Sequence, residues 1–122
     1  MAWQRQVGAA LEYLERFTGG IVVPTIADVD VGITVVPLVQ GDPERITIMF
    51  INLGTGNVFV SPDSVPSSAH GILLGPNGGI FAANVFQDGI LPTLAWSAVS
   101  ALGTQDVFTL TSRRDVRAPL EG

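Results

Sequence analysis

Side chains that could support catalysis gather in one short stretch of the sequence. Asp63, Ser67, Ser68 and His70 are the residue types of a Ser-His-Asp triad, and His70 is the single histidine of the chain. A triad is normally assembled from distant segments on a rigid scaffold, whereas these four residues are close neighbours in sequence. The chain also lacks a nucleophile elbow of the G-x-S-x-G type. We therefore expect no catalytic residues and predict that the protein is not an enzyme.

Two further patterns resemble ligand sites. Asp28 and Asp30 would point off one face of a strand, with Asp42 near them across a hairpin, and such oxygen ligands could hold Ca²⁺ weakly. The alternative, which we favour, is that solvated carboxylates protect an exposed strand from edge-to-edge aggregation. The glycine-rich segment 75–79 has no Lys-Ser or Lys-Thr after it, so it predicts a hairpin turn rather than a phosphate-binding loop. The sequence contains no Cys. We expect neither a metal nor a cofactor.

The composition limits the partners that the chain could have. Charged residues make up 14% of the sequence, against about 25% in a typical soluble domain, and the net charge is −5. Phosphate binding needs clustered Lys and Arg, so this acidic balance argues against nucleic acid. The mean hydropathy of +0.43 would suit a membrane protein, but Gly, Pro, Asn or Asp interrupts every apolar stretch. A spanning helix needs roughly 20 mostly apolar residues, and we therefore expect no membrane partner.

The shortage of charge belongs mainly to the middle of the chain. Between Thr18 and Ser112 only eight residues are charged, and seven of them are acidic. Obligate interfaces are apolar and depleted in charge, so this deficit predicts that much of the surface packs against other subunits. The alternative is a small β domain whose polar face consists of Ser, Thr, Asn and Gly.

Residues 1–20 are predicted to form an N-terminal helix or arm. Over residues 2–17 the apolar residues follow helical spacing, and Gly19 and Gly20 provide a C-terminal stop. An isolated helix of this length is marginal in water, so it must dock on its own sheet, on a neighbouring subunit or on copies of itself. The residues of this stripe that we take as candidate interface residues are Trp3, Val7, Leu11, Leu14 and Phe17.

Residues 21–112 are predicted to form one antiparallel β-sandwich or jelly-roll of about seven or eight strands. Short apolar segments recur at spacings near ten residues and are separated by Gly- and Pro-rich turns. Both faces of the segment 45–52 are apolar, which suits a strand that lies between layers or at an interface. The expected strands are 28–35, 45–52, 58–60, 71–74, 80–86, 94–100 and 106–111. Trp96 and the phenylalanines within these strands are predicted to lie in the core, namely Phe50, Phe59, Phe81, Phe86 and Phe108.

Residues 44–112 contain an alternating strand, an N-x-G-T turn at 52–55, a V-F-V strand followed by a loop, and a glycine-rich turn at 76–79. The later segments 67–74, 91–98 and 102–107 continue this scheme of short strands and turns. In this pattern the chain resembles small β-sandwich proteins of tailed-bacteriophage particles. Relatives of this style are virion structural components, often capsid decoration (cement) proteins. The resemblance therefore implies a non-enzymatic particle component.

What the resemblance implies about partners follows from that role. A cement subunit would form a homo-oligomer, with a trimer favoured, and would bind the major capsid protein or other virion subunits on the capsid surface after synthesis in the host cytoplasm. Residues 113–122 are predicted to be a polar tail, in which Arg113, Arg114 and Arg117 could pair with acidic groups of a capsid subunit. The alternatives are another particle component, such as a tail, baseplate or head–tail fitting, or a β-sandwich module that binds a glycan or receptor.

Overall fold

The computed structural model describes residues 21–115, and these form a mainly β chain. The predicted helix 1–20 with its apolar stripe, and Arg117 in the predicted tail, lie outside the described residues. The strands are β1 (Ile21–Val31), β2 (Val36–Val39), β3 (Arg45–Asn52), β4 (Val58–Ser61), β5 (Ile72–Leu74), β6 (Gly79–Asn84), β7 (Trp96–Ser100) and β8 (Gln105–Asp115). Two short helical turns, α2 (Val85–Asp88) and η1 (Leu91–Thr93), join β6 to β7.

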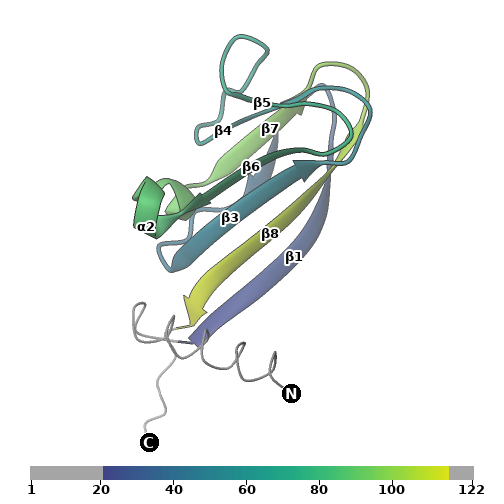
Figure 1. Ribbon diagram of the computed structural model, residues 1–122. Coiled ribbons are helices and arrows are strands. Elements are labelled where there is room, and N and C mark those ends of the chain that lie inside the picture. The colour runs from purple at the N-terminus through teal and green to yellow at the C-terminus, as the bar shows by residue number, and fades with distance from the viewer. Residues whose placement is uncertain (1–20, 116–122) are drawn as a thin grey trace, which may run out of the picture.

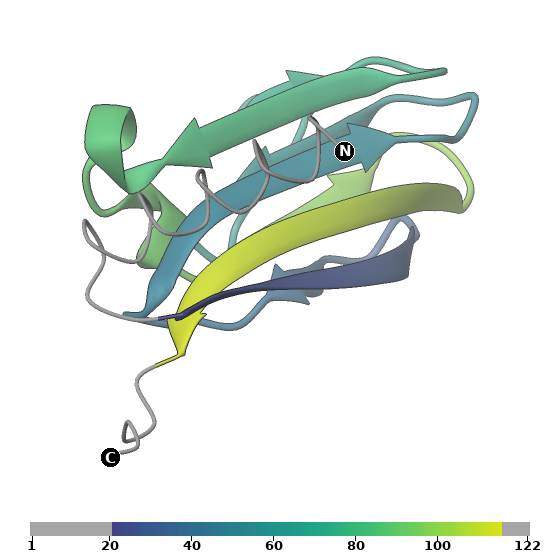
Figure 2. The same ribbon diagram turned by 60° about the horizontal axis from the view of Figure 1, so that its bottom comes forward.

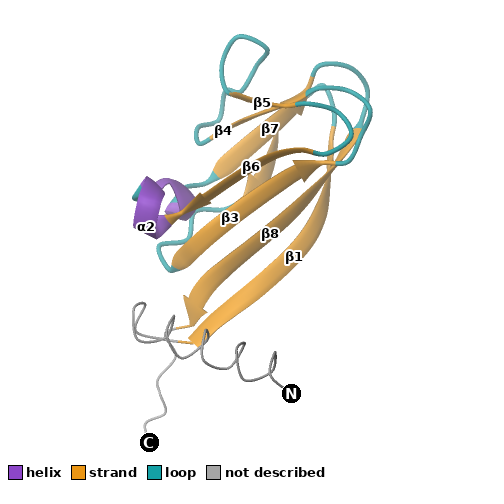
Figure 3. Cartoon of the chain, in the orientation of Figure 1, coloured by secondary structure: helices purple, strands orange, loops and turns teal. Residues whose placement is uncertain are grey.

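The strands form two antiparallel sheets of four strands each (Figure 3). One sheet has the order β1-β8-β3-β6 and strands of 11, 11, 8 and 6 residues, and we call it the long sheet. The other has the order β2-β7-β4-β5 and strands of 4, 5, 4 and 3 residues, and we call it the short sheet. The long sheet therefore extends past the short one, as β1 and β8 do in Figure 1. Figure 2 shows the four strands of the long sheet side by side in one curved layer.

The core lies between the inner faces of the two sheets. Along β3 every second side chain is buried, with Ile48 and Phe50 almost inaccessible to solvent. Phe50, Phe81 and Trp96 pack as an aromatic trio with ring centroids 5.2–6.4 Å apart, and the Trp96 indole N–H donates to the carbonyl of Leu91 at 3.0 Å. Two of these rings belong to the long sheet and the third, Trp96, to the short sheet, so their packing fixes how the two sheets face each other. The core placement predicted for Phe50 and Trp96 is confirmed.

Several predicted elements have different bounds in the structure, and three of these differences change the interpretation. The expected strand 28–35 is wrong, because β1 ends at Val31 and β2 begins at Val36. Gly32 lies at the break, where its carbonyl accepts a hydrogen bond from the backbone of Ser100 while the chain crosses from one sheet to the other. The strand expected at 80–86 ends at Asn84, whose side chain accepts from the amides of Phe86 and Gln87 and so caps α2. Strand β8 continues to Asp115, so the polar tail does not begin at residue 113.

Candidate functional site

The loop after β4 does not assemble a catalytic relay. The His70 Nε2 atom lies 2.7 Å from Asp63 Oδ2, but within residues 21–115 neither the Ser67 nor the Ser68 hydroxyl donates to the His70 imidazole, and Ser67 and His70 are joined through their backbones. The Ser67 hydroxyl instead accepts from the backbone of Ala69. The Ser61 hydroxyl donates to Asp63 at 2.7 Å and, together with the Val65 amide and His70, lowers the pKa of Asp63 to about 2. These contacts tie the exposed loop to itself.

The structure separates the three carboxylates considered for calcium. Asp42 lies in the turn before β3 and pairs with Arg113, which is opposite Val23 near the start of β1. Asp28 and Asp30 lie further along β1, where Asp30 is opposite Asp106 of β8. Among the described residues no cluster of His, Asp and Glu could hold a metal ion. No helix in this part of the chain is long and apolar enough to cross a membrane.

The glycine-rich segment 75–79 is a turn that connects β5 of the short sheet to β6 of the long sheet, and the predicted hairpin is wrong because these two strands do not pair with each other. Asn77 and Gly78 donate to the carbonyls of Gly54 and Asn52, at 2.8 and 2.7 Å, and Gly79 donates to Gly75 at 3.1 Å. A side chain at Gly79 would collide with the backbone of Gly75, so this turn requires glycine there. The amides that a phosphate would need are therefore used to join this turn to the neighbouring one.

The N-x-G-T motif on which the resemblance partly rests is a structural tie. The Asn52 side chain is fully buried and donates to the carbonyls of Gly56, Leu74 and Gly75, at 2.7, 3.0 and 3.1 Å, and it accepts from the amide of Gly54. Because Asn52 ends β3 and Leu74 ends β5, these bonds link the long sheet to the short sheet. A side chain at Gly54 would overlap that of Gln105, which explains the glycine in the motif.

Two of the tail arginines form ion pairs within the chain instead of extending towards a partner. Arg113 Nε donates to Asp42 Oδ2 at 2.7 Å, and Arg114 Nε donates to Glu44 Oε1 at the same distance. The Arg113 guanidinium, together with the backbone of Glu44, lowers the pKa of Asp42 although partial burial opposes the shift. Nearby, Arg45 is buried and its guanidinium donates to backbone carbonyls of the adjoining loops. This end of the long sheet is therefore held by charged groups.

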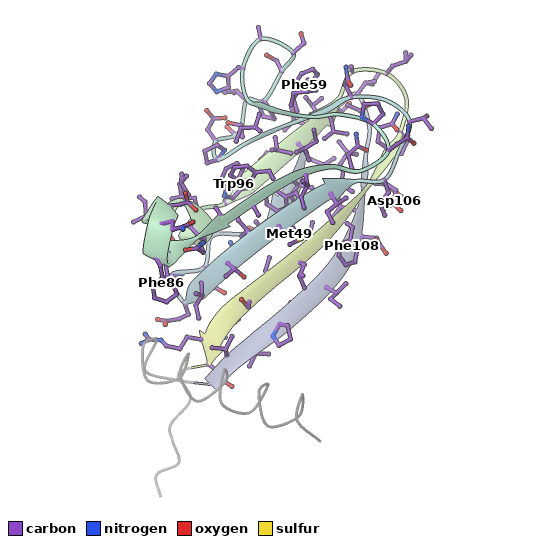
Figure 4. The ribbon with its side chains drawn as sticks, in the orientation of Figure 1. Met49, Phe59, Phe86, Trp96, Asp106 and Phe108 are labelled. Carbon is purple, nitrogen blue, oxygen red and sulfur yellow. The ribbon has the colours of Figure 1, made fainter. Side chains whose placement is uncertain are left out.

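The outer face of the long sheet carries two apolar rows in its centre. Strand register places Ile26, Leu110, Met49 and Ala82 opposite one another in one row, and Phe108, Ile51 and Ile80 in the next. We call these seven residues the long-sheet face. Ile26 and Ile80 are 65% and 56% exposed, and among residues 21–115 no strand or helix is layered over this face. Figure 4 shows Met49 and Phe108 on the strands nearest the viewer.

The outer face of the short sheet is free of charge. Its four strands contain no Asp, Glu, Lys or Arg. Register places Leu73, Phe59 and Val99 in one row across β5, β4 and β7. A groove of about 470 Å³ lies along this row under the loop after β4, and its wall includes Val35 and Pro66. We call Val35, Phe59, Leu73 and Val99 the short-sheet face.

The prediction that every strand phenylalanine lies in the core is wrong for three of them. Phe59 and Phe108 are half-buried and lie on the two outer faces, and Phe86 is 57% exposed on α2. Strand alternation contained the signal, because Val58 and Val60 beside Phe59, and Val107 beside Phe108, are fully buried. Residues on either side of a buried strand residue face the opposite way. Parity, rather than apolarity, therefore identifies the outward aromatic rings.

Comparisons with known proteins bear on the fold. No protein-family model matches the chain, and no curated protein is similar to it in sequence. The structure is similar to a solved chain from Bacillus endospore appendages, which form a novel family of disulfide-linked pili. The likeness covers 76% of this chain and 87% of that chain, with a TM-score of 0.50 and 13% sequence identity. At this identity the likeness concerns the fold alone.

Proposed function

We propose that the chain is a non-enzymatic structural subunit of a tailed-bacteriophage virion, with capsid decoration as its role. Its copies associate through the short-sheet face into a homo-oligomer, a trimer by preference, which then binds the major capsid protein. The observation that carries this proposal is the row of Leu73, Phe59 and Val99 on the outer face of a sheet whose strands contain no charge, where Leu73 is exposed and the other two are half-buried. An apolar row of this kind is typical of a surface that another subunit covers.

The strand order supports a jelly-roll β-sandwich as the scaffold. The chain alternates between the two sheets so that β1, β8, β3 and β6 fall in one and β2, β7, β4 and β5 in the other. Two four-stranded antiparallel sheets with these crossovers correspond to the jelly-roll, an architecture that viral capsid domains use. This scaffold agrees with the resemblance of residues 44–112 to small virion proteins.

The structural neighbour supports the broader part of the proposal. The endospore appendage chain belongs to pili, so a fold like this one can serve as the unit of a large assembly. Those pili are disulfide-linked, whereas this chain has no Cys and would rely on non-covalent contacts. Burial of apolar surface contributes about 25 cal/mol per Å², and many identical copies add avidity. The uncharged strands of the short sheet reduce the cost of desolvation at such a contact.

The proposal is tested with Val99→Glu, which places a carboxylate in the centre of the short-sheet face. Light scattering should give an oligomer for the wild-type chain and a monomer for this variant. The matched control is Ile90→Glu, because Ile90 is 70% exposed between α2 and η1 and away from the face. A wild-type monomer, or a Val99→Glu chain that keeps the oligomer mass, would contradict association through this face.

The particle assignment needs a separate measurement. Wild-type protein and the Ile90→Glu variant should cosediment with empty capsids of the parent phage, while Val99→Glu should remain in the supernatant. Binding to tails or baseplates but not to capsids would contradict capsid decoration and assign the subunit to another part of the particle. Saturable binding to a glycan, with no binding to any particle, would replace the proposal by a receptor-binding module.

A further inference from the structure

We propose that residues 2–17 form a helix that packs on the long-sheet face of the same chain. Within residues 21–115 nothing is layered on the two apolar rows of that face, although they lie in the middle of the largest sheet. Adjoining β1 in the sequence is an amphipathic segment of sixteen residues with one apolar stripe. The occupant is thus the part of the chain that connects directly to the sheet, and the inference is independent of the particle in which the protein works.

The connection between segment and sheet allows this packing. Only Thr18, Gly19 and Gly20 separate the predicted helix from β1, which is an edge strand of the long sheet. Three extended residues reach about 10 Å, which is the thickness of one helix layer. The two glycines permit the backbone to reverse its direction there. The link is thus long enough to lift a helix onto its own sheet and lay it antiparallel to β1.

The dimensions of segment and face also agree. Sixteen helical residues span about 24 Å at a rise of about 1.5 Å per residue. From Ile21 to Asp28 the strand β1 advances by about 23 Å at about 3.3 Å per residue. A helix that starts its return at Ile21 therefore covers both apolar rows and ends level with Asp28. Val7 then lies near the row of Met49 and Leu110.

Charge at the far end of the face favours the same direction. Asp28 ends the second apolar row, opposite Phe108, and Asp30 and Asp106 lie beyond it and directly opposite each other. An antiparallel helix brings its N-terminus, which carries a partial positive charge, to this acidic end, with Arg5 in its first turns. A helix that ran the other way would place Glu12 and Glu15 there instead. The acidic end therefore selects one direction.

The absence of cysteine in the natural chain makes disulfide trapping a direct test. The variant Val7→Cys/Met49→Cys joins the apolar stripe to the long-sheet face, and Val7→Cys/Leu110→Cys is a second pair in the same row. The matched control is Arg5→Cys/Met49→Cys, in which the cysteine lies on the polar side of the predicted helix. Under mild oxidation of the full-length chain, we expect the Val7 pairs to close about tenfold faster than the control, at the mass of one chain and at a rate independent of protein concentration.

Mixing two single-cysteine chains separates the possible occupants. If Val7→Cys and Met49→Cys chains form a mixed disulfide faster than the double variant closes on itself, the segment covers a neighbouring copy and the proposal is wrong. If neither Val7 pair closes faster than the control while circular dichroism shows the folded chain, the segment does not lie on this face at all, and the proposal is also wrong.

Discussion

The outer faces of the two sheets are both apolar, but they differ in what surrounds them. The long-sheet face lies between an acidic end, with Asp30 opposite Asp106, and an end held by the pairs of Arg113 and Arg114. The short-sheet face has no charged residue in its strands and forms the floor of a groove. The first is matched in length and charge by the segment that precedes β1, whereas the second has no such counterpart. We infer that one face is covered within the chain and that the other meets further copies.

We expect the largest loss of stability when the side-chain hydrogen bonds that link the two sheets are removed. Asn52→Ala removes four hydrogen bonds at a fully buried site and leaves the carbonyls of Leu74 and Gly75 without that donor. We expect a loss of about 2–4 kcal/mol in the free energy of unfolding, measured by urea denaturation. Asn57→Ala, an exposed position in the next turn, is the control and should change little. Equal stability of the two variants would contradict the role of Asn52.

A charge in the long-sheet face should cost stability and leave the oligomer intact. Phe108→Glu places a carboxylate opposite Asp28 and beneath the predicted helix, so we expect the free energy of unfolding to fall by about 1–3 kcal/mol. Leu102→Glu is the control, since Leu102 is 78% exposed in the turn before β8. Thermal unfolding of both variants measures the difference. If they are equally stable, the face is open to water and the comparison between the two faces fails.

The ion pairs at the charged end of the long sheet should contribute less to the free energy of unfolding than the two sites above. The Arg113 and Asp42 side chains are 40% and 22% exposed, and solvent screens such a pair, so Arg113→Ala should lower the free energy of unfolding less than Phe108→Glu does. Arg113 lowers the pKa of Asp42 in the folded chain, and the contribution of the pair is therefore complete above the ordinary pKa of 3.8 and disappears as the pH falls through the lowered value. Urea denaturation between pH 6 and about pH 2 should show this acid-dependent loss in the wild type and much less of it in Arg113→Ala. If the variant has the same pH profile as the wild type, the pair of Arg113 and Asp42 is not the cause of the acid-dependent loss.

The smallest effect concerns the loop that borders the groove of the short-sheet face. Hydrogen bonds from Ser61 and Val65, and the contact with His70, lower the pKa of Asp63 to about 2. The ionised Asp63 carboxylate stabilises the loop conformation above pH 3.8, and this stabilisation is lost as the pH falls through about 2. A carboxyl titration followed by NMR should give this low pKa, and Ser61→Ala should raise it. Because Asp63 and His70 are exposed, Asp63→Asn should leave global unfolding unchanged.

Sequence reasoning was most accurate where local alternation decided the structure. Strand β3 has the predicted bounds 45–52, and from Ile46 to Asn52 its buried and half-exposed residues alternate without a break. Local pattern could not locate the crossing at Gly32, since Ile33 and Val35 continue the alternation after the chain has left β1. Ile33 is 71% exposed as a result. Periodicity reports the spacing of apolar residues but not the sheet to which they belong.

The site was harder to predict because its members are brought together by tertiary structure. Arg113 and Arg114 looked like a solvated tail, and only the pairing of β8 with β1 and β3 places them beside Asp42 and Glu44. The row of Leu73, Phe59 and Val99 draws one residue from each of three strands, which no single segment reveals. The charge deficit of the middle of the chain predicts a surface for contacts, and strand register was needed to locate the two apolar faces.

The most direct test of the account compares one substitution in each face by sedimentation velocity. Phe59→Glu and Phe108→Glu introduce the same side chain in place of the same half-buried ring, on the short sheet and on the long sheet respectively. The account predicts an oligomer for the wild type and for Phe108→Glu, and a folded monomer for Phe59→Glu. An oligomer that survives Phe59→Glu but dissociates in Phe108→Glu would contradict the assignment of the two faces.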